Sequence, residues 1–374
     1  MTVMTGGQAV VQTLKANGVT TVFGIPGTHN LPIYDALYHE QASIRHILAR
    51  HESGAGLMAN GYARASGRPG IAIVTTGPAA GNIMGSVGDA YRDSVPVLVI
   101  ASQITSGFIG QDRGVFHEMR DQLGMASSIT KWSRRVTRVA DIPAAVNEAW
   151  LAMTSGRPRP AYIEVPEDIL ASEGELEIAP APLLPPPAAD AQLVARAASI
   201  LRKATRPLIL AGGGANWSGA TPELANLAGA LGAPVITTCN GKGALPDDHP
   251  LALGFSAYGP SPFSNLWQQA DVMLAIGTDL DEITTGGWRL PQPQSLLQVD
   301  IDAAQIGRNY AVDVGLAGDA ATVLRQIAGA LDRPGSQTQT SWTSQALDMR
   351  RRLAAAAAGT DGLVLVQALG VALR

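Results

Sequence analysis

One segment places a carboxylate between an expected strand and an expected helix: Arg50-His51-Glu52-Ser53-Gly54-Ala55-Gly56-Leu57-Met58-Ala59-Asn60-Gly61-Tyr62-Ala63-Arg64-Ala65-Ser66-Gly67. Residues 43–49 before it are rich in apolar side chains and predict a strand, whereas apolar residues from Ala55 to Ala63 recur at helical spacing. Glu52 therefore lies at a strand-to-helix junction, which in a parallel sheet is the carboxyl edge where ligands bind. A Glu that merely starts the helix in solvent fits the same position, because a helix N-terminus favours a carboxylate.

Strands and helices alternate along the rest of the chain. In the first part, apolar runs predict strands at 21–25, 43–49, 70–75, 95–101 and 161–165. In the second part, they predict strands at 207–211, 234–238, 271–277 and 295–300. Segments of helical periodicity lie between them, and this alternation predicts an α/β protein with two doubly wound parallel-sheet domains.

Length and composition set the expected domain boundaries. The 374 residues suit two to three domains. We expect a first domain at residues 1–170 and a Rossmann-like central domain at 191–332. Residues 171–190 contain closely spaced prolines without periodicity, which predicts a semi-rigid linker. Residues 333–374 are expected to form a second linker and the first helix of a further domain.

The segment around Glu52 resembles the His-Glu segment of thiamine diphosphate enzymes, the family of acetolactate synthase and the 2-oxo acid decarboxylases. The resemblance identifies residues 1–170 as the family's pyrimidine-binding domain and residues 191–332 as its central domain. In that family the Glu hydrogen-bonds N1′ of the cofactor's aminopyrimidine and drives this ring to its imino form. The resemblance therefore implies that Glu52 is both cofactor-binding and catalytic, since the step needs a carboxyl that holds a proton near neutral pH.

A turn ahead of His29 resembles the first cofactor loop of this family: Phe23-Gly24-Ile25-Pro26-Gly27. Glycine lets a backbone approach a ligand closely, so Pro26 and Gly27 are expected to contact the cofactor. An ordinary strand-to-helix turn fits the same residues. Some decarboxylase and lyase members carry a His at the position of His29 for acid–base steps, which implies a catalytic role for His29, with a structural histidine as the alternative.

A second segment resembles the family's T-S-G-P-G-A-T-N loop: Thr75-Thr76-Gly77-Pro78-Ala79-Ala80-Gly81-Asn82. The resemblance implies that Thr76, Gly77 and Asn82 contact the pyrimidine ring. The segment departs from the family's pattern at two positions, Ala79 and Gly81.

His117 is the third catalytic candidate, in Gly114-Val115-Phe116-His117-Glu118. Many acetolactate synthases carry Gln at this position, whereas the guanidino-oxo acid decarboxylase-like members carry His-Glu. An imidazole exchanges protons near neutral pH, as protonation of a decarboxylation product requires. A surface loop histidine is the alternative.

The central domain contains a glycine-rich turn after a predicted strand, Gly212-Gly213-Gly214. Such a turn at a helix N-terminus suits a diphosphate, but it lacks the full G-x-G-x-x-G spacing. The resemblance implies FAD in this domain for some members, ADP for others and no ligand for many. We expect an empty, structural domain.

The family's third domain holds the diphosphate and Mg²⁺ through a G-D-G segment and a downstream Asn, which supply hard oxygen ligands. Neither Gly318-Asp319-Ala320 nor Asp361-Gly362 fits this pattern, so we expect no metal ligand in this chain. We expect either a truncated product or a second polypeptide that supplies this domain, and a chain that is inactive alone. Because the family's active site spans two subunits, the resemblance also implies a homo-oligomer formed through the pyrimidine-binding domain.

Composition excludes other classes of protein. The net charge of −4 gives no reason to expect nucleic acid or an anionic membrane as a partner. The first residues show no signal-peptide pattern, and no apolar run approaches the roughly 20 residues of a membrane span, so we expect a cytoplasmic protein. The single cysteine, Cys239, is expected to be a small buried hydrophobe.

We therefore expect a thiamine diphosphate-dependent decarboxylase or carboligase, similar to acetolactate synthase, that acts on a small 2-oxo acid. Two alternatives stay open. One is a non-catalytic assembly or binding module, and the other is a nucleotide-binding oxidoreductase built on the Gly212–Gly214 turn. The absence of an acidic ribose partner at a clear position argues against the oxidoreductase.

Overall fold

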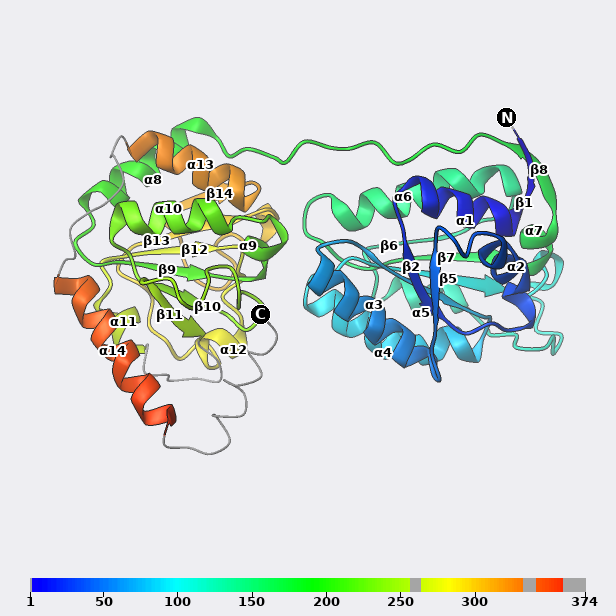
Figure 1. The fold of residues 1–374 in the computed structure, drawn as a ribbon, viewed down its shortest axis with the longest axis horizontal. Helices are drawn as coiled ribbons and strands as arrows, with labels where there is room; N and C mark the ends of the chain where they lie inside the picture. The colour runs from blue at the N-terminus through cyan, green and yellow to red at the C-terminus, as the bar shows by residue number, and fades with distance from the viewer. Residues whose placement is uncertain (1, 256–263, 332–340, 359–374) are drawn as a thin grey trace. The chain divides into compact units, whose positions relative to one another are not determined.

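The chain divides into two compact units, Met1–Leu184 and Pro185–Arg374, in a computed structural model that describes residues 2–255, 264–331 and 341–358 (Figure 1). Each unit is built on a six-stranded sheet whose neighbouring strands all pair in parallel. The expected fold class, two doubly wound parallel-sheet domains, is confirmed.

The first unit contains eight strands, seven α-helices and three 3₁₀ helices (η) among its described residues. They are β1 (Thr2–Thr5), α1 (Gly6–Ala16), β2 (Thr21–Gly24), η1 (Thr28–Asn30), α2 (Leu31–His39), β3 (Arg45–Leu48), α3 (Glu52–Ser66), β4 (Gly70–Val74), α4 (Pro78–Arg92), β5 (Val97–Gln103), η2 (Ser106–Phe108), α5 (Gln122–Ser127), β6 (Trp132–Arg135), η3 (Val139–Asp141), α6 (Ile142–Thr154), β7 (Ala161–Pro166), α7 (Glu167–Ala171) and β8 (Glu173–Leu176). The large sheet has the order β3-β2-β4-β5-β7-β6. From β2 the chain continues toward one edge of the sheet, to β3, and from β4 it continues toward the other edge, so the switch point of the strand order lies between β2 and β4. In such sheets ligands bind at the switch point, outside the carboxyl ends of the strands.

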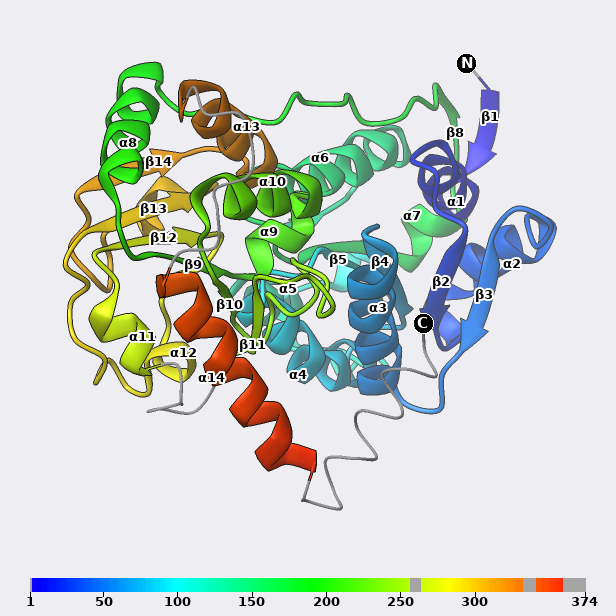
Figure 2. The ribbon, with the colours of Figure 1, turned by 60° about the vertical axis from the view of Figure 1, so that its left-hand side comes forward.

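Helices cover both faces of this sheet, with α1 and α6 on one face and α3 and α4 on the other (Figure 1). The strands β4 and β5 are buried throughout, as expected for a sheet that is covered on both sides. Figure 2 shows α3 beside α4, and the two helices are in contact. Gly56 permits this approach, because a Cβ at that position would lie 1.9 Å from Oγ of Ser86.

A small second sheet in this unit differs from the prediction for residues 171–190. All four residues of β8, which were expected to belong to a linker, pair antiparallel with β1, from Thr2 opposite Leu176 to Thr5 opposite Glu173. Residues 177–190 have no helix or strand. Sequence reasoning missed the pair because β1 and β8 are short and lie about 170 residues apart, so neither shows a periodic pattern of its own.

The central unit repeats the alternation of strands and helices. Its described elements are α8 (Ala191–Lys203), β9 (Pro207–Ala211), α9 (Gly213–Trp217), α10 (Thr221–Leu231), β10 (Val235–Thr237), β11 (Ala252–Phe255), α11 (Ser264–Gln269), β12 (Val272–Ile276), α12 (Glu282–Thr285), β13 (Leu296–Asp300), η4 (Ala303–Gln305), β14 (Val314–Ala317), α13 (Ala320–Leu331) and α14 (Ser341–Ala358). The sheet order is β11-β10-β9-β12-β13-β14, which is the classical Rossmann order, and its switch point lies between β9 and β12.

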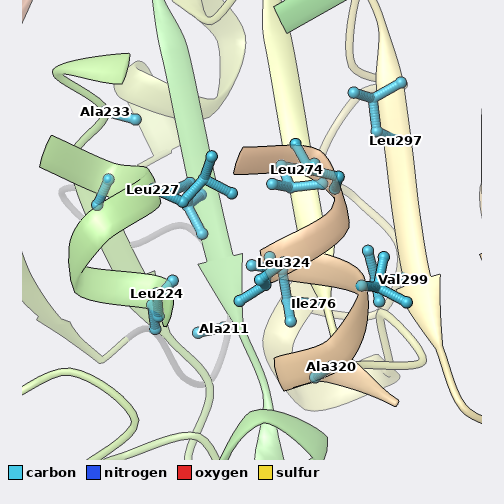
Figure 3. Close-up of a cluster of buried hydrophobic side chains, with 14 of the residues drawn as sticks. Ala211, Leu224, Leu227, Ala233, Leu274, Ile276, Leu297, Val299, Ala320 and Leu324 are labelled. Atoms are coloured by element: carbon cyan, nitrogen blue, oxygen red, sulfur yellow. The ribbon is translucent and has the colours of Figure 1, made fainter. Parts of the chain in front are cut away.

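Alternate residues of the central strands face opposite layers. Figure 3 shows one layer, in which Leu274 and Ile276 of β12 meet Leu324 of α13. Met273 and Ala275 of the same strand belong to the buried cluster on the other face. This two-residue period explains why both faces of β12 are apolar and why the strand appears in the sequence as a continuous apolar run.

Helix α14 packs on the central unit, although residues 333–374 were expected to lead into another domain. The indole Nε1 of Trp342 donates to the carbonyl of Pro207 at 2.8 Å, and Ala346 is fully buried. Arg350 donates to the carbonyls of Asp247 and His249. Trp342, Ala346 and Met349 form one apolar stripe of a helix that docks, which explains the difference. Residues 332–340 and 359–374 of that predicted segment lie outside the described residues.

Two further observations concern sequence-based expectations. Cys239 is exposed, which corrects the expectation of a buried side chain, because β10 ends at Thr237 and the chain then enters a turn. Within residues 2–255, 264–331 and 341–358, no helix has the length and apolar character needed to cross a membrane.

Candidate active site

The switch point of the first unit brings together the two loops that sequence reasoning assigned to a cofactor. Gly27 follows β2, and a Cβ at that position would lie 2.7 Å from Cβ of Thr75, which follows β4. The backbone N–H of Gly27 donates to Oδ1 of Asn30 at 2.7 Å, which fixes the turn, and Pro26 is exposed beside it. Glycine is thus needed at position 27 for the two loops to meet.

Gly77 supports the loop that carries His117. Its φ of 68° and ψ of −113° form a combination that suits only glycine, and a Cβ there would lie 2.2 Å from the carbonyl oxygen of His117. The preceding Thr76 is buried, and its hydroxyl is 3.0 Å from Oγ of Ser102. The loops after β4 and β5 are therefore packed together without space for a side chain at position 77.

A buried polar network beneath Gly77 was not found from the sequence. Oε1 of Gln122 accepts from the N–H of Gly77 at 2.7 Å, while its Nε2 lies 2.9 Å from the hydroxyl of Tyr162 and 3.0 Å from Oε2 of Glu164. Glu164 also pairs with Arg135. Burial raises the pKa of Tyr162 well above its ordinary value, so this hydroxyl stays neutral. These residues hold the backbone of the glycine loop in place.

The imidazoles of His29 and His117 lie close together, with ring centroids 5.7 Å apart. Phe116 stacks against both rings, at 3.8 Å from His117 and 6.0 Å from His29. Nδ1 of His29 and Nδ1 of His117 are both buried and have no hydrogen-bond partner among the described residues. An unsatisfied buried polar atom costs roughly 1–3 kcal/mol, so two such atoms on neighbouring rings make this a candidate place for a polar ligand or an ordered water.

Opposing effects act on the protonation of His29. Burial lowers the pKa of His29, the Glu167 carboxylate raises it, and His117 lowers it to a lesser extent. Nε2 of His29 lies 3.8 Å from Oε2 of Glu167. The net lowering of this pKa makes the neutral imidazole the main form at pH 7, and the nearby Glu167 carboxylate stabilises the imidazolium form that can donate a proton.

The carboxylate of Glu118 organises the loop around His117. It accepts hydrogen bonds from the N–H groups of Asp112, Arg113, Gly114 and Val115, at 2.8–3.0 Å. These bonds, with that from Val115 the largest contribution, hold the pKa of Glu118 below its ordinary value. His117 itself has a φ of 67°, an uncommon conformation for a residue with a side chain. The His-Glu pair thus combines an imidazole with the carboxylate that shapes its loop.

Glu52 and Asn82 form a second group of candidates. Glu52 is the first residue of α3, and its Oε2 accepts from Nδ2 of Asn82 on α4 at 2.9 Å. The hydroxyl of Ser53 donates to the carbonyl of Asn82 at 2.6 Å. Nδ1 of His51 accepts from the N–H of Ser53 and caps the helix. His51 therefore caps helix α3, and the half-buried Glu52 carboxylate does not serve as the cap.

The glycine-rich turn of the central unit is packed against its own neighbours. A Cβ at Gly212 would lie 2.3 Å from the carbonyl oxygen of Gly277, and one at Gly277 would lie 2.5 Å from Cα of Gly214. Close contact between two backbone segments accounts for these glycines without a nucleotide.

Two domain families match the chain. The thiamine pyrophosphate enzyme N-terminal TPP-binding domain matches residues 4–125, and the thiamine pyrophosphate enzyme central domain matches residues 194–327. The chain belongs to the thiamine pyrophosphate enzyme family and contains its pyrimidine-binding and central domains, as the sequence analysis expected.

Among curated relatives, a probable acetolactate synthase large subunit of Methanocaldococcus jannaschii is 37% identical, over 93% of this chain and 60% of its own. A probable 2-ketoarginine decarboxylase of Pseudomonas aeruginosa is 40% identical, over 87% of this chain and 57% of its own. The acetolactate synthase isozyme 2 large subunit of Escherichia coli is 36% identical, over 89% and 60%. The chain thus spans less than two thirds of the length of these relatives.

The described residues suit the aminopyrimidine end of thiamine diphosphate. This heterocycle carries ring nitrogens and an amino group, and the Glu52 carboxylate, which already accepts from Asn82, suits a protonated ring nitrogen. Gly27 lets its loop approach the side chain of Thr75, and Gly77 lets its loop approach the backbone of His117. The donors and acceptors therefore fit the cofactor that the family implies.

Proposed function

We propose that this chain provides the pyrimidine-binding and central domains of a thiamine diphosphate-dependent enzyme that removes CO₂ from a 2-oxo acid. The observation that carries the proposal is the switch point of the first unit. There, two buried imidazole nitrogens that have no hydrogen-bond partner in the described part of the chain adjoin the glycine loop, and a carboxylate starts the helix that follows the neighbouring strand β3. Perturbed titratable groups at such an edge are typical of active sites.

The residues of this chain would have distinct roles. Thiamine diphosphate supplies, when bound, the centre that accepts the electron pair left by the departing carboxylate. Glu52 would hold or release a proton at the pyrimidine ring, with Asn82 fixing the orientation of its carboxylate. His29 and His117 would deliver the proton that replaces the carboxylate on the product. Phe116, stacked on both imidazoles, would shield them from water.

The two imidazoles favour proton delivery, and so simple decarboxylation, over joining the product to an acceptor. Release by protonation needs a proton donor at the site, and the imidazoles of His29 and His117 lie there with ring centroids 5.7 Å apart. The relative named as a 2-ketoarginine decarboxylase supports the same direction. Carboligation, as the acetolactate synthase relatives' names describe, is the second candidate.

We also propose that the diphosphate and Mg²⁺ are held outside these 374 residues, on the same polypeptide or on another. In support, the matched regions cover 57–60% of the relatives, which leaves roughly 40% of their length for a further domain. A homo-oligomer formed through the first unit and a cytoplasmic location belong to the same proposal. The central unit would be structural, since its glycines serve backbone packing.

The test is a CO₂-release assay on the longest polypeptide that includes this chain, with a panel of aliphatic, aromatic and guanidino 2-oxo acids. We expect turnover that requires both thiamine diphosphate and Mg²⁺. Aldehyde as the only organic product would support the decarboxylase, and a 2-hydroxy ketone would support the carboligase. An oligomer that forms normally but turns over no 2-oxo acid would instead support an assembly module.

A further inference from the structure

Glu167 is a carboxylate at the active-site edge that sequence reasoning did not single out. It is the first residue of α7 and directly follows β7, so it occupies the carboxyl edge of the sheet. Its Oε2 lies 3.8 Å from Nε2 of His29, whose side chain is only 5% exposed. The carboxylate itself is one third exposed, so it stays hydrated while facing a buried imidazole.

The orientation of Glu167 is fixed by its neighbours. The hydroxyl of Thr105 donates to Oε1 at 2.5 Å, which leaves Oε2 directed at the imidazole. The next residue, Asp168, accepts from both the N–H and the hydroxyl of Ser106, so α7 is attached to the loop after β5 at two successive positions. A carboxylate held in this way is preorganised for its partner and loses little entropy when a charge appears there.

Few other ionisable groups face His29 among the described residues. Burial lowers the pKa of His29 most, and His117, which lies across from it on the loop of residues 111–120, lowers this pKa to a lesser extent. On α2, which also contacts η1, Tyr34 is half-buried and its hydroxyl donates to the carbonyl of Ile73, and Asp35 and His39 are largely exposed and pair with each other. Glu167 is the acidic group that opposes these effects.

We propose that Glu167 is a positioning residue for the reaction, the fixed acidic partner that lets the buried His29 imidazole carry a proton to the product. The proposal rests on the proposed function. Loss of CO₂ breaks one carbon–carbon bond and leaves an electron pair for which the bound cofactor would supply the acceptor. The former carbonyl carbon then needs one proton to give the aldehyde, which the His29 imidazolium would donate, and solvent would return one proton to the imidazole. Throughout, the Glu167 carboxylate balances the imidazolium charge at 3.8 Å.

The first test follows the protonation of His29 by ¹H–¹⁵N NMR of the histidine side chains. The chain has six histidines, and the signal of His29 is assigned by its loss in His29→Gln. In Glu167→Gln we expect its titration midpoint to move to lower pH, because the lost carboxylate is the group that raises this pKa. Glu167→Asp keeps the charge and should restore most of the midpoint.

The matched control is Asp168→Asn, which removes a carboxylate one residue away that bonds to Ser106. Its His29 midpoint should stay at the wild-type value. Equal midpoints in Glu167→Gln and wild type, with both proteins folded by their melting curves, would overturn the pairing. An equal shift in Asp168→Asn would also overturn it, because the effect would then be one of general charge.

The second test measures turnover against pH in the complete enzyme. We expect kcat of Glu167→Gln to decline on the alkaline side from a lower pH than wild type, with KM unchanged, since less imidazolium is present at each pH. A displaced NMR midpoint with an unmoved pH profile would overturn the role in turnover. If wild type turns over no 2-oxo acid at any pH, the proposed function fails with that role, whereas the NMR midpoint still decides the Glu167–His29 pair.

Discussion

Both units are doubly wound parallel sheets, but different groups surround the switch point in each. In the first unit the loops after β2 and β4 carry His29 and Gly77, and two imidazole nitrogens there are buried without a partner among the described residues. In the central unit the ends of β9 and β12 are joined by backbone hydrogen bonds. The N–H of Gly212 donates to the carbonyl of Ile276 at 2.8 Å, and the N–H of Gly214 donates to the carbonyl of Gly277.

This difference shows that glycines in a turn at the carboxyl edge of a parallel sheet can serve two structural purposes. Gly77 makes room for the backbone of a loop that carries a titratable side chain, whereas Gly212 and Gly277 make room for each other. A parallel sheet with its switch point supplies a place for a ligand, but the side chains around that place decide whether chemistry occurs there.

The largest expected effect is a loss of turnover when a residue at the first unit's switch point is changed, compared with a residue at the central unit's switch point. In the complete enzyme, His29→Ala should lower kcat by about 10²–10⁴-fold, the usual contribution of a positioned acid or base. Asn216→Ala, which removes bonds to the carbonyls of Asn240 and Lys242 beside the central turn, should leave kcat near wild type. Steady-state CO₂ release measures both variants. Comparable losses would show that the central turn also takes part in catalysis.

Removing the Trp342 side chain should destabilise the central unit alone. The indole is 3% exposed and donates to the carbonyl of Pro207, so Trp342→Ala should cost about 3–5 kcal/mol of that unit's unfolding free energy. Denaturant unfolding followed by fluorescence measures the change. The first unit should unfold at its wild-type midpoint, and a joint shift of both transitions would show that the two units unfold together.

The third prediction compares the two glycines directly. Gly77→Ala and Gly277→Ala both introduce a Cβ at positive φ within 2.5 Å of backbone atoms, so each should destabilise its unit by roughly 1–3 kcal/mol. Only Gly77→Ala should shift the side-chain NMR signals of His117, because a Cβ at position 77 would lie 2.2 Å from the carbonyl oxygen of His117. Shifted His117 signals in Gly277→Ala would contradict the separation of the two sites.

The smallest effect is an acid-dependent loosening of the His117 loop. The pKa of Glu118 is lowered in the folded chain, so its bonds to residues 112–115 contribute fully above the ordinary carboxyl pKa and are lost as pH falls through the lowered value. Amide exchange of residues 112–115, corrected for intrinsic rates, should accelerate in that acid range and not in Glu118→Gln. The amides of Gly212 and Gly214, bonded to backbone carbonyls, should show no such dependence.

The sequence was sufficient to predict the fold class, because alternating apolar runs are local patterns, and the resemblance to the family singled out the loops at residues 23–27 and 75–82 that meet at the switch point. It did not reveal Gln122 or Glu118, since their roles depend on contacts with backbone groups whose positions come from tertiary structure. Glu167 gave a signal that was overlooked, because it follows the predicted strand 161–165 at the same edge of the sheet as Glu52. The docking of α14 also required the structure.

The most direct test of the account is proton exchange at C2 of thiamine diphosphate bound to the complete enzyme, followed by NMR in wild type and Glu52→Gln. Gln keeps the size of the side chain and its hydrogen bonding but cannot carry the proton. We predict that exchange slows by about 10²–10⁴-fold while cofactor affinity and the melting temperature change little. Normal exchange in Glu52→Gln, with a stability loss of roughly 1 kcal/mol as for a helix cap, would contradict the catalytic role of Glu52.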